Sequence, residues 1–372
     1  MGQMPLPEKF LDMAGDEAAN VVRECKARLG KKVVILGHHY QRDEIIEFAD
    51  FTGDSLRLSE IAAEQSAKYI VFCGVHFMAE SADILASEDQ MVFLPDMDAG
   101  CSMADMAEID DVEVCWEFLE KNLKNFKDIV PVTYVNSSAN IKAFVGRNGG
   151  YCCTSSNCEQ VLKKIWDKNK NAKILFLPDQ HLGRNTAFKM GVPLNMMAFW
   201  KAGKEGGGGK LAQLQKSPVI LWNGSCCVHQ KFNVEQIKAV RKAAKDMKII
   251  VHPECCFDVV QAADYNGSTS QIIKIVEESE PGSQWAIGTE SSLVNRLRDQ
   301  LEPKGIYVQT LGGVPRQCST MYRNDIQHLA WIMDLIYRLD AGEKVEMYNR
   351  VVVDDEIKAD AKLALRRMLE KS

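Results

Sequence analysis

The sequence predicts an α/β fold of three similar three-layer αβα domains, each with a small parallel sheet, and three observations support this. Short apolar runs rich in Val and Ile recur along the 372 residues, with helix-like stretches between them. Apolar strands that alternate with helices are typical of parallel sheets covered on both faces. The same order of helix, strand, polar cluster and hydroxyl-rich segment occurs three times, and a cysteine follows the last strand of each repeat. We therefore expect the domains to surround a pseudo-threefold axis, with the active site at the central interface.

Nine apolar runs are expected to form the strands, three in each repeat. They are residues 33–37, 69–74, 91–96, 129–136, 174–179, 219–224, 249–254, 285–290 and 306–310. An amphipathic helix is predicted before the first strand of each repeat, at residues 16–29, 113–126 and 233–246. Their apolar residues recur every three or four positions, which is the period of a helix with one buried face.

Polar residues close the first strand of each repeat. These clusters are His38-His39-Tyr40, Tyr134-Val135-Asn136 and His252-Pro253-Glu254. Segments with small hydroxyl side chains follow and open the next helix; they are Gly53-Asp54-Ser55, Thr154-Ser155-Ser156-Asn157 and Gly267-Ser268-Thr269-Ser270. Ligands of parallel α/β sheets bind at the carboxyl ends of the strands. All three sets of residues are therefore expected to face one cavity.

The spacing within the repeats supports this division. The polar clusters precede their cysteines by 63, 90 and 66 residues, counted from His38, Asn136 and His252. The Gly-rich segment 201–217 accounts for most of the excess in the middle repeat and is expected to be an inserted surface loop. The expected domains are residues 16–110, 111–230 and 231–325, followed by C-terminal helices in 326–372 that pack on the core.

Composition and charge exclude several classes of protein. With 46% hydrophobic and 26% charged residues, the chain has ample material for a core and is not expected to be disordered. No apolar run approaches the ~18 residues of a membrane span, and the N-terminus does not resemble a secretory signal. The net charge is −6 and no basic tract occurs, so neither nucleic acid nor a membrane is expected as a partner. A cytoplasmic protein is the expectation.

Twelve cysteines are the unusual feature of the composition. In a reducing compartment they are thiols, nucleophiles or metal ligands rather than disulfides. One cysteine closes each repeat: Cys101, Cys226 and Cys318. Three converging thiolates do not suit structural zinc, which takes four protein ligands. They suit one [4Fe–4S] cluster per chain with three irons held by cysteine and one iron open, which can act as a Lewis acid.

The three hydroxyl-rich segments admit two interpretations. Helix N-termini carry free N–H groups and the positive end of the helix dipole, so they bind carboxylates or phosphates. Ser, Thr and Asp also commonly do no more than cap their helices. The two roles are compatible. Three such segments around one cavity favour a small substrate rich in negative charge.

Five side chains are candidates for acid–base catalysis: His38, Tyr40, His229, His252 and Glu254. A single histidine is more often structural than catalytic. These histidines, however, stand at or just beyond strand ends that border the predicted cavity, where proton transfer to a ligand is feasible.

Eleven segments, taken in order, resemble one known family. They are ILGHHYQ, FADFTGDSL, VFCGVHFMAESADIL, LPDMDAGCSMAD, YVNSSANIKA, CTSSN, PDQHLG, WNGSCCVH, VHPECC, NGSTSQI and AIGTESSLVNRL. Between about residue 30 and about residue 325 the chain is similar to the quinolinate synthase (quinolinate synthetase A) family of de novo NAD biosynthesis.

The resemblance implies three αβα domains around a pseudo-threefold axis and an oxygen-sensitive [4Fe–4S] cluster held by one cysteine from each domain. By motif position these ligands are Cys101, Cys226 and Cys318. It also implies an enzyme, a condensing transferase, that joins iminoaspartate to dihydroxyacetone phosphate and releases phosphate and two waters to give quinolinate. An L-aspartate oxidase or an aspartate dehydrogenase would supply the iminoaspartate.

Site residues can be assigned by matching motifs. His38 and Tyr40 match acid–base residues that act on the triose-derived part of the substrate, and Tyr134 and Asn136 match residues that hold the dicarboxylate. His252 and Glu254 match the His-Pro-Glu motif, with Glu254 as a base. The residues matching anion-binding hydroxyls are Ser55, Ser155, Ser268 and Thr269.

Two other functions are compatible with parts of the pattern. A [4Fe–4S] hydro-lyase acting on a hydroxy-dicarboxylate would use the open iron, but it would need only one anion pocket. An iron–sulfur regulator would need a nucleic-acid-binding element, which neither the charge nor any basic helix suggests.

Overall fold

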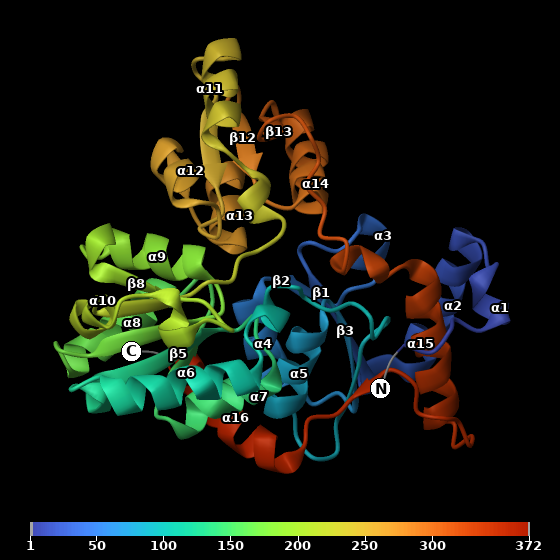
Figure 1. The fold of residues 1–372 in the computed structure, drawn as a ribbon. Coiled ribbons are helices and arrows are strands. Elements are labelled where there is room, and N and C mark those ends of the chain that lie inside the picture. The colour runs from blue at the N-terminus through green and yellow to red at the C-terminus, as the bar shows by residue number, and fades with distance from the viewer. Residues whose placement is uncertain (1–2, 371–372) are drawn as a thin grey trace. The chain divides into compact units, whose positions relative to one another are not determined.

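The chain folds into two compact units with three parallel-dominated sheets between layers of helices, which confirms the α/β class (Figure 1). The structure is a computed structural model that describes residues 3–370. Unit 1 comprises the described residues up to Cys101 together with Gln317–Asp354. Unit 2 comprises Ser102–Arg316 and the C-terminal residues from Asp355 onward.

Unit 1 contains one sheet with helices on both faces. Its strands are β1 (Val33–His38), β2 (Phe51–Gly53), β3 (Tyr69–Cys73), β4 (Met91–Phe93) and β14 (Arg350–Val351). Its helices are α1 (Glu8–Leu11), α2 (Gly15–Leu29), α3 (Asp43–Ile46), α4 (Ser55–Glu64), α5 (His76–Leu85) and α15 (Ile326–Asp340). Helices α2 and α15 cover one face and α4 and α5 the other (Figure 1).

The burial pattern of β1 explains why both faces need a cover. Val33 and Ile35 belong to a hydrophobic cluster with α2 and α15, while Val34 and Leu36 are buried on the opposite face. Successive strand residues point to opposite faces, so an unbroken apolar run requires a sheet with two covered faces. On α2 the buried residues Ala18, Val22, Cys25 and Leu29 follow the helical period.

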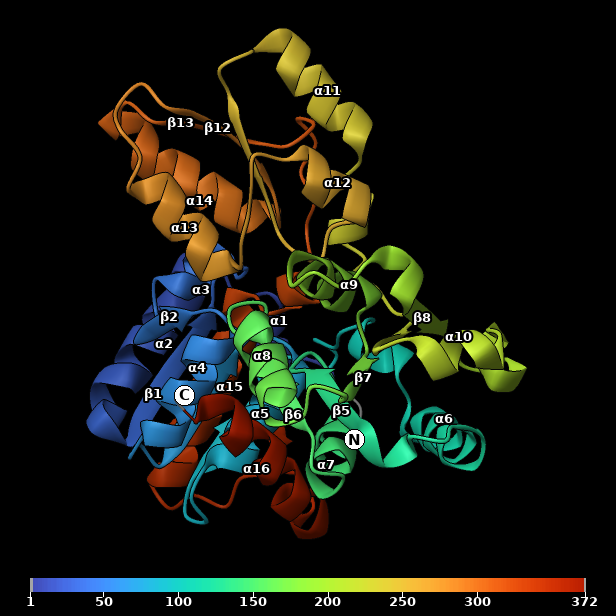
Figure 2. The same ribbon diagram turned by 90° about the vertical axis from the view of Figure 1, so that its left-hand side faces the viewer.

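Unit 2 contains two sheets. The strands of its first sheet are β5 (Ile129–Tyr134), β6 (Tyr151–Cys153), β7 (Lys173–Leu177), β8 (Met197–Trp200) and β9 (Val219–Trp222). The accompanying helices are α6 (Ile109–Asn122), α7 (Ala139–Arg147), α8 (Cys158–Lys168), α9 (Gln180–Lys189), α10 (Leu211–Lys216) and α16 (Asp355–Leu369). Helix α16 lies along α7, and both views show the pair (Figures 1 and 2).

The second sheet of unit 2 has four strands: β10 (Lys248–Val251), β11 (Tyr265–Asn266), β12 (Gln284–Gly288) and β13 (Tyr307–Thr310). Its helices are α11 (Val234–Ala243), α12 (Phe257–Ala262), α13 (Thr269–Glu277) and α14 (Ser291–Leu301). In Figure 2, α13 and α14 lie on one side of this sheet and α11 and α12 on the other, which gives three layers.

The predicted threefold repeat is present in the strand topology. The sheets contain the orders β2-β1-β3-β4, β6-β5-β7-β9 and β11-β10-β12-β13, with parallel neighbours in every case. In each sheet, the second of these strands along the chain lies on one side of the first strand. The later strands follow one another on its other side. Strand β14 adds an antiparallel edge beside β4, and β8 adds a parallel edge beside β9.

All nine predicted strands form, but the sequence did not reveal β8 or β14 or, in each repeat, one further short strand. The further short strands are the edge strands β2, β6 and β11. Each spans only two or three residues just before a hydroxyl-rich segment. A run this short has too few residues to display an apolar pattern.

The Gly-rich segment 201–217 is more ordered than the predicted surface loop. It contains α10 and a 3-10 turn, Glu205–Gly208, in which Gly206, Gly207 and Gly208 have positive φ. Gly207 is buried against the ring of Trp200, where a Cβ would collide. The glycines therefore allow a tight turn that packs closely beside β8.

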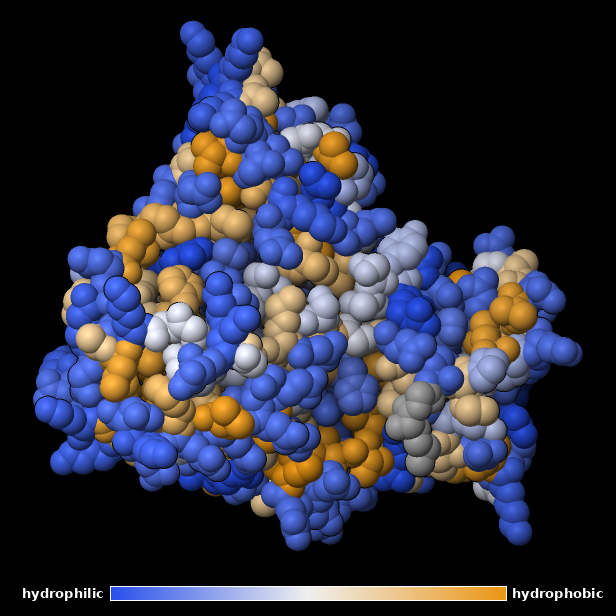
Figure 3. Space-filling view, viewed as in Figure 1, coloured by the Kyte–Doolittle hydropathy of each residue, from blue (hydrophilic) through white to orange (hydrophobic). Residues whose placement is uncertain are grey.

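Hydrophilic residues predominate on the face shown in Figure 3, where hydrophobic residues form small separate groups. Within residues 3–370, no helix has the length and apolar character needed to cross a membrane.

The contact between α7 and α16 predicts a stability effect. Gly146 of α7 faces the backbone of α16, and a Cβ there would collide with the carbonyl of Asp360. Gly146→Ala should therefore lower the free energy of unfolding of unit 2 by about 2 kcal/mol, as overpacking does. Urea denaturation followed by circular dichroism measures this. Gly15→Ala, at the open start of α2 with no atom near the added Cβ, is the control and should not destabilise. Equal midpoints for both variants would contradict the prediction.

Candidate active site

Polar residues at the carboxyl ends of β1 and β10 share one local arrangement. The Tyr40 N–H donates to His38 Nδ1 at 3.1 Å, and the Glu254 N–H donates to His252 Nδ1 at 3.3 Å. In each case a histidine accepts from the backbone two residues later, so the neutral imidazole carries its proton on Nε2. His38 and His252 are buried. The two strand ends thus hold equivalent histidines through the same backbone contact.

In unit 2, Glu254 is the centre of a buried polar cluster. Its carboxylate lies 2.7 Å from His229 Nδ1 and 4.0 Å from His252 Nδ1. The two imidazoles stack with ring centroids 4.3 Å apart. His229 Nε2 lies 3.1 Å from the hydroxyl of Thr289, which is fully buried. His229 is therefore held at both ring nitrogens, by residues that follow two different strands, β10 and β12.

The charge of Glu254 is determined by its neighbours. Burial alone would raise the pKa of this carboxyl, but His229, His252 and a hydrogen bond from the Tyr134 hydroxyl outweigh it and hold the pKa at about 2. Opposite charge and donated hydrogen bonds favour an ionised carboxylate, whereas desolvation opposes it. Glu254 is consequently an anion at neutral pH, although only 2% of its surface is exposed.

Cys226 belongs to the same site. Its Sγ, a ring nitrogen of His229 and a carboxylate oxygen of Glu254 all lie within 4.8 Å of one another. Cys226 and Cys227 follow β9 in a loop, so the alternation of side chains along a strand does not decide which of the two faces the site. The same holds for Cys255 and Cys256, which follow β10.

In unit 1, the segment that carries Cys318 contacts two other segments with predicted site residues, the end of β1 and the loop after β4. Gln41, just after Tyr40, donates to the carbonyl of Met321 at 3.1 Å. Arg323 contacts Asp96 at 2.9 Å and Asp98 at 3.3 Å, in the turn before Cys101. Residues 318–324 therefore connect the end of β1 to the loop after β4, and the predicted residues His38, Tyr40, Cys101 and Cys318 lie on segments held together.

Burial divides the cysteines into two groups. Seven are buried, and burial raises the pKa of Cys25 to about 11 and those of Cys73 and Cys152 to about 12. Such thiols stay protonated and are poor ligands. Five are partly exposed: Cys101, Cys226, Cys227, Cys256 and Cys318. All three predicted ligands are in the exposed group.

Two of the three hydroxyl-rich segments cap their helices through a side chain, as the simpler interpretation expected, whereas the N-cap of α8, Asn157, makes no side-chain cap hydrogen bond. Asp54 accepts from the Arg57 N–H at the start of α4, and Ser268 forms a capping box with Gln271 at the start of α13. The Ser268 hydroxyl also lies 2.9 Å from that of Ser156. Ser55 and Thr269 are the first residues of their helices, while Ser155 lies in the turn before α8. A role in binding anions stays a prediction.

Asn136, predicted to hold a dicarboxylate, has a buried Oδ1 without a hydrogen-bond partner among the described residues. A buried polar atom of this kind is costly unless a further group pairs with it. Its position just beyond β5, two residues after Tyr134, suits a group that meets a ligand.

Comparison with known proteins decides the family. The model of the quinolinate synthetase A protein family matches residues 20–370. The chain belongs to the quinolinate synthetase A family. It is 50% identical over 369 residues to a quinolinate synthase of Bacillus cereus, with 98% of this chain and 96% of the relative covered. A quinolinate synthase of Acidobacterium capsulatum is 50% identical over 363 residues, with 98% and 95% covered.

The structure adds residues to this quinolinate synthetase A site that the sequence did not single out. At the start of α9, Asp179 is fully buried and caps the helix through bonds from the N–H groups of His181 at 2.5 Å and Leu182 at 3.4 Å. Burial, reinforced by Arg184, lowers the pKa of His181 to about 4. The signal was available, because the polar segment Pro178–His181 follows a strand end as the other clusters do.

Asp179 predicts a pH effect on stability. Burial raises its pKa well above the ordinary 3.8, and the Glu254 carboxylate raises it further. The folded state then retains a proton that the unfolded chain loses above about pH 4, so this group's contribution to stability falls as the pH rises. Asp179→Asn keeps the cap without ionising. The melting temperature of the variant relative to the wild type should therefore increase between about pH 5 and about pH 7.5. A pH-independent difference would show that the Asp179 pKa is not raised.

Proposed function

We propose that the protein is a quinolinate synthase that condenses iminoaspartate with dihydroxyacetone phosphate. The products are quinolinate, one phosphate and two waters, which account for all atoms of the two substrates. The observation that carries this proposal beyond family membership is the ionised Glu254 between two histidines and Tyr134, beside a partly exposed cysteine. This combination supplies a base, proton carriers and a metal ligand in one place.

The substrates are small and strongly anionic, and the hydroxyl-rich helix starts suit them. Ser55, Ser155, Ser268 and Thr269 lie at or near the N-termini of α4, α8 and α13. The N–H groups and dipoles at these ends favour phosphate and carboxylates. Asn136 can donate to a carboxylate through Nδ2 and accept from the substrate nitrogen through its unpaired Oδ1. Together with Tyr134 it is proposed to hold the dicarboxylate.

Proton transfers are assigned to Glu254, His229, His252, His38 and Tyr40. As a buried anion, Glu254 can accept a proton from a substrate carbon during aromatisation, and the stacked histidines compensate the change of charge. His252 and His38 each accept a backbone hydrogen bond at Nδ1, and a proton on Nε2 of these rings can be donated to a departing hydroxyl. His38 and Tyr40, whose rings are in edge-to-face contact at 4.7 Å, are proposed to act on the triose-derived part.

The thiols suit a [4Fe–4S] cluster, which we propose is held by Cys101, Cys226 and Cys318. Each is partly exposed rather than buried, and Cys226 faces polar groups. Three cysteines leave one iron open, and when bound the cluster supplies a Lewis acid that polarises a substrate oxygen or nitrogen. The cluster explains why we expect oxygen sensitivity. Cytoplasmic location and supply of iminoaspartate by an L-aspartate oxidase or an aspartate dehydrogenase belong to the same proposal.

The proposal is tested by anaerobic purification followed by iron and sulfide analysis and an activity assay. We expect about four of each per chain, as a [4Fe–4S] cluster requires, with an absorbance spectrum that quinolinate perturbs. Quinolinate should form from iminoaspartate and dihydroxyacetone phosphate. Iron without any response to quinolinate would count against a substrate-accessible cluster, and zinc alone after anaerobic reconstitution would refute the cofactor assignment.

Cys226 and its neighbour offer a matched pair of variants. Cys226→Ser should abolish the cluster because its Sγ faces His229 and Glu254, whereas Cys227→Ser should retain iron and the broad cluster absorbance. Both thiols are partly exposed, so general accessibility does not distinguish them. The opposite result would show that Cys227 is the ligand.

A further inference from the structure

One buried amide joins helix α9 to the turn that carries Glu254. Asn185 Nδ2 lies 2.8 Å from the carbonyl oxygen of Pro253 and 2.9 Å from that of Cys255. These are the residues on either side of Glu254. The side chain is only 6% exposed, so water does not compete effectively for these two bonds. Both hydrogens of one amide group are thus donated to the backbone that flanks the proposed base.

We propose that Asn185 is a positioning residue that sets the direction of the Glu254 carboxylate. The inference rests on the function proposed above for Glu254. Within the turn, the Glu254 N–H donates to His252 Nδ1 and the Cys255 N–H donates to the His252 carbonyl at 3.0 Å. Those bonds are local and would move with the turn. Asn185 supplies an anchor from a separate helix, which fixes the turn relative to the sheet that carries Tyr134.

Helix α9 is itself well held, so it can serve as a reference for the turn. Asp179 caps its first turn, and the ring of Phe188 meets that of Phe257 edge to face at 4.8 Å. Phe257 begins α12, the helix that follows the Glu254 turn. Two contacts therefore join α9 to this region, one through the amide of Asn185 and one through an aromatic pair.

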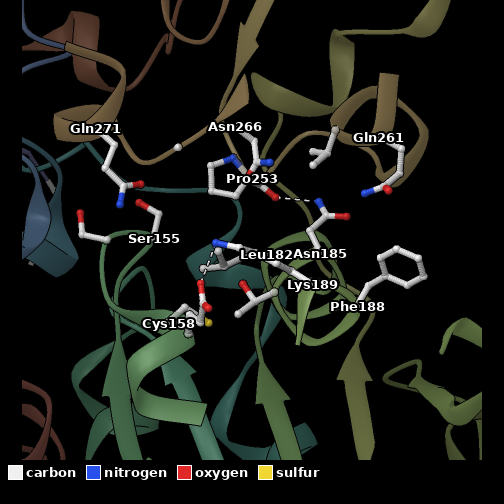
Figure 4. A pocket seen from close by; sticks show the side chains of 15 residues that line it. Ser155, Cys158, Leu182, Asn185, Phe188, Lys189, Pro253, Gln261, Asn266 and Gln271 are labelled. Carbon is white, nitrogen blue, oxygen red and sulfur yellow. Dashed lines mark hydrogen bonds and ion pairs between the residues drawn. The ribbon is translucent and has the colours of Figure 1, made fainter. Parts of the chain in front are cut away.

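The carbonyl oxygen of the Asn185 side chain, Oδ1, does not take part in the two hydrogen bonds to the Glu254 turn. Its Oδ1 has no hydrogen-bond partner among the described residues and points away from Pro253 (Figure 4). Asn185 and Pro253 both line a cavity of about 230 Å³ between α8, α9, α12 and α13. Asn185→Asp therefore keeps the size and the unpaired oxygen but replaces the donor of both bonds with a second acceptor. Repulsion between this oxygen and the two carbonyls should displace the turn.

The test compares three variants with the wild type, all loaded with iron under anaerobic conditions. Asn185→Asp and Asn185→Ala should lower kcat for quinolinate formation by about tenfold to a hundredfold, the effect expected of a misplaced catalytic group, while KM stays unchanged. Thr186→Val is the control, because Thr186 is buried on the same helix and lines the same cavity. No hydrogen bond in the described structure joins its side chain to residues 252–256, so its kcat should match the wild type. Iron content and melting temperature are measured for each.

Asn185→Ala is included in case Asn185→Asp fails to fold. It adds no charge, and the space that it leaves opens into the existing cavity rather than the core. Normal kcat in both Asn185 variants, a raised KM with normal kcat, or an equal loss in Thr186→Val would each overturn the positioning role. Glu254→Gln separates this inference from the proposed function. If that variant is inactive while the Asn185 variants are fully active, only the Asn185 inference fails. Wild-type activity in Glu254→Gln would instead refute the role of the base.

Discussion

A carboxylate that is removed from water and yet ionised is the constraint on which the site of unit 2 depends. Glu254 is 2% exposed, and an isolated buried carboxylate would take up a proton. The charge is retained because His229, His252 and Tyr134 surround it. Both histidines are fixed in turn: His229 by Thr289, and His252 by the N–H of Glu254 itself. Several strand ends must therefore be placed correctly before one negative charge is stable.

The threefold repeat provides these strand ends by using the same strand topology three times. One arrangement of four strands, with the first two in reverse order and parallel neighbours, occurs in each sheet. A parallel sheet gathers the polar residues that end its strands along one edge. The first strand end of each repeat carries a different cluster, so a duplicated scaffold provides distinct chemistry: a histidine and a tyrosine after β1, a tyrosine and an asparagine after β5, and a histidine and a glutamate after β10. Because the strands are buried on both faces, they occur in the sequence as unbroken apolar runs and can be predicted from it.

The sequence predicted the strands and helix starts, which follow from local residue patterns. It did not predict the side-chain contacts that arise only when the elements pack together. Nine apolar runs predicted nine strands, and the hydroxyl-rich segments predicted helix starts, since both follow from local composition. The edge strands β2, β6 and β11 were too short to detect. Asp179, His181 and Asn185 were overlooked because their roles come from burial and from contact with residues about 70 positions away, as with Asn185 and Cys255. The hydrogen bonds of Glu254 with His229 and Tyr134 likewise cannot be recognised from the sequence alone, because these residues are far apart in it.

The last fifty residues have a consequence for how the chain is made. Helix α15 contributes Leu329, Ile332 and Met333 to the same cluster as β1 and β3, and β14 pairs with β4. Helix α16 then covers α7, with Arg367 donating to the carbonyls of Gly146 and Gly150. Neither unit has its full core until α15 and α16 have been synthesised. One apolar face of the unit 1 sheet therefore stays without its α15 cover for most of translation, a period in which protection from aggregation matters more than for domains that fold as they emerge.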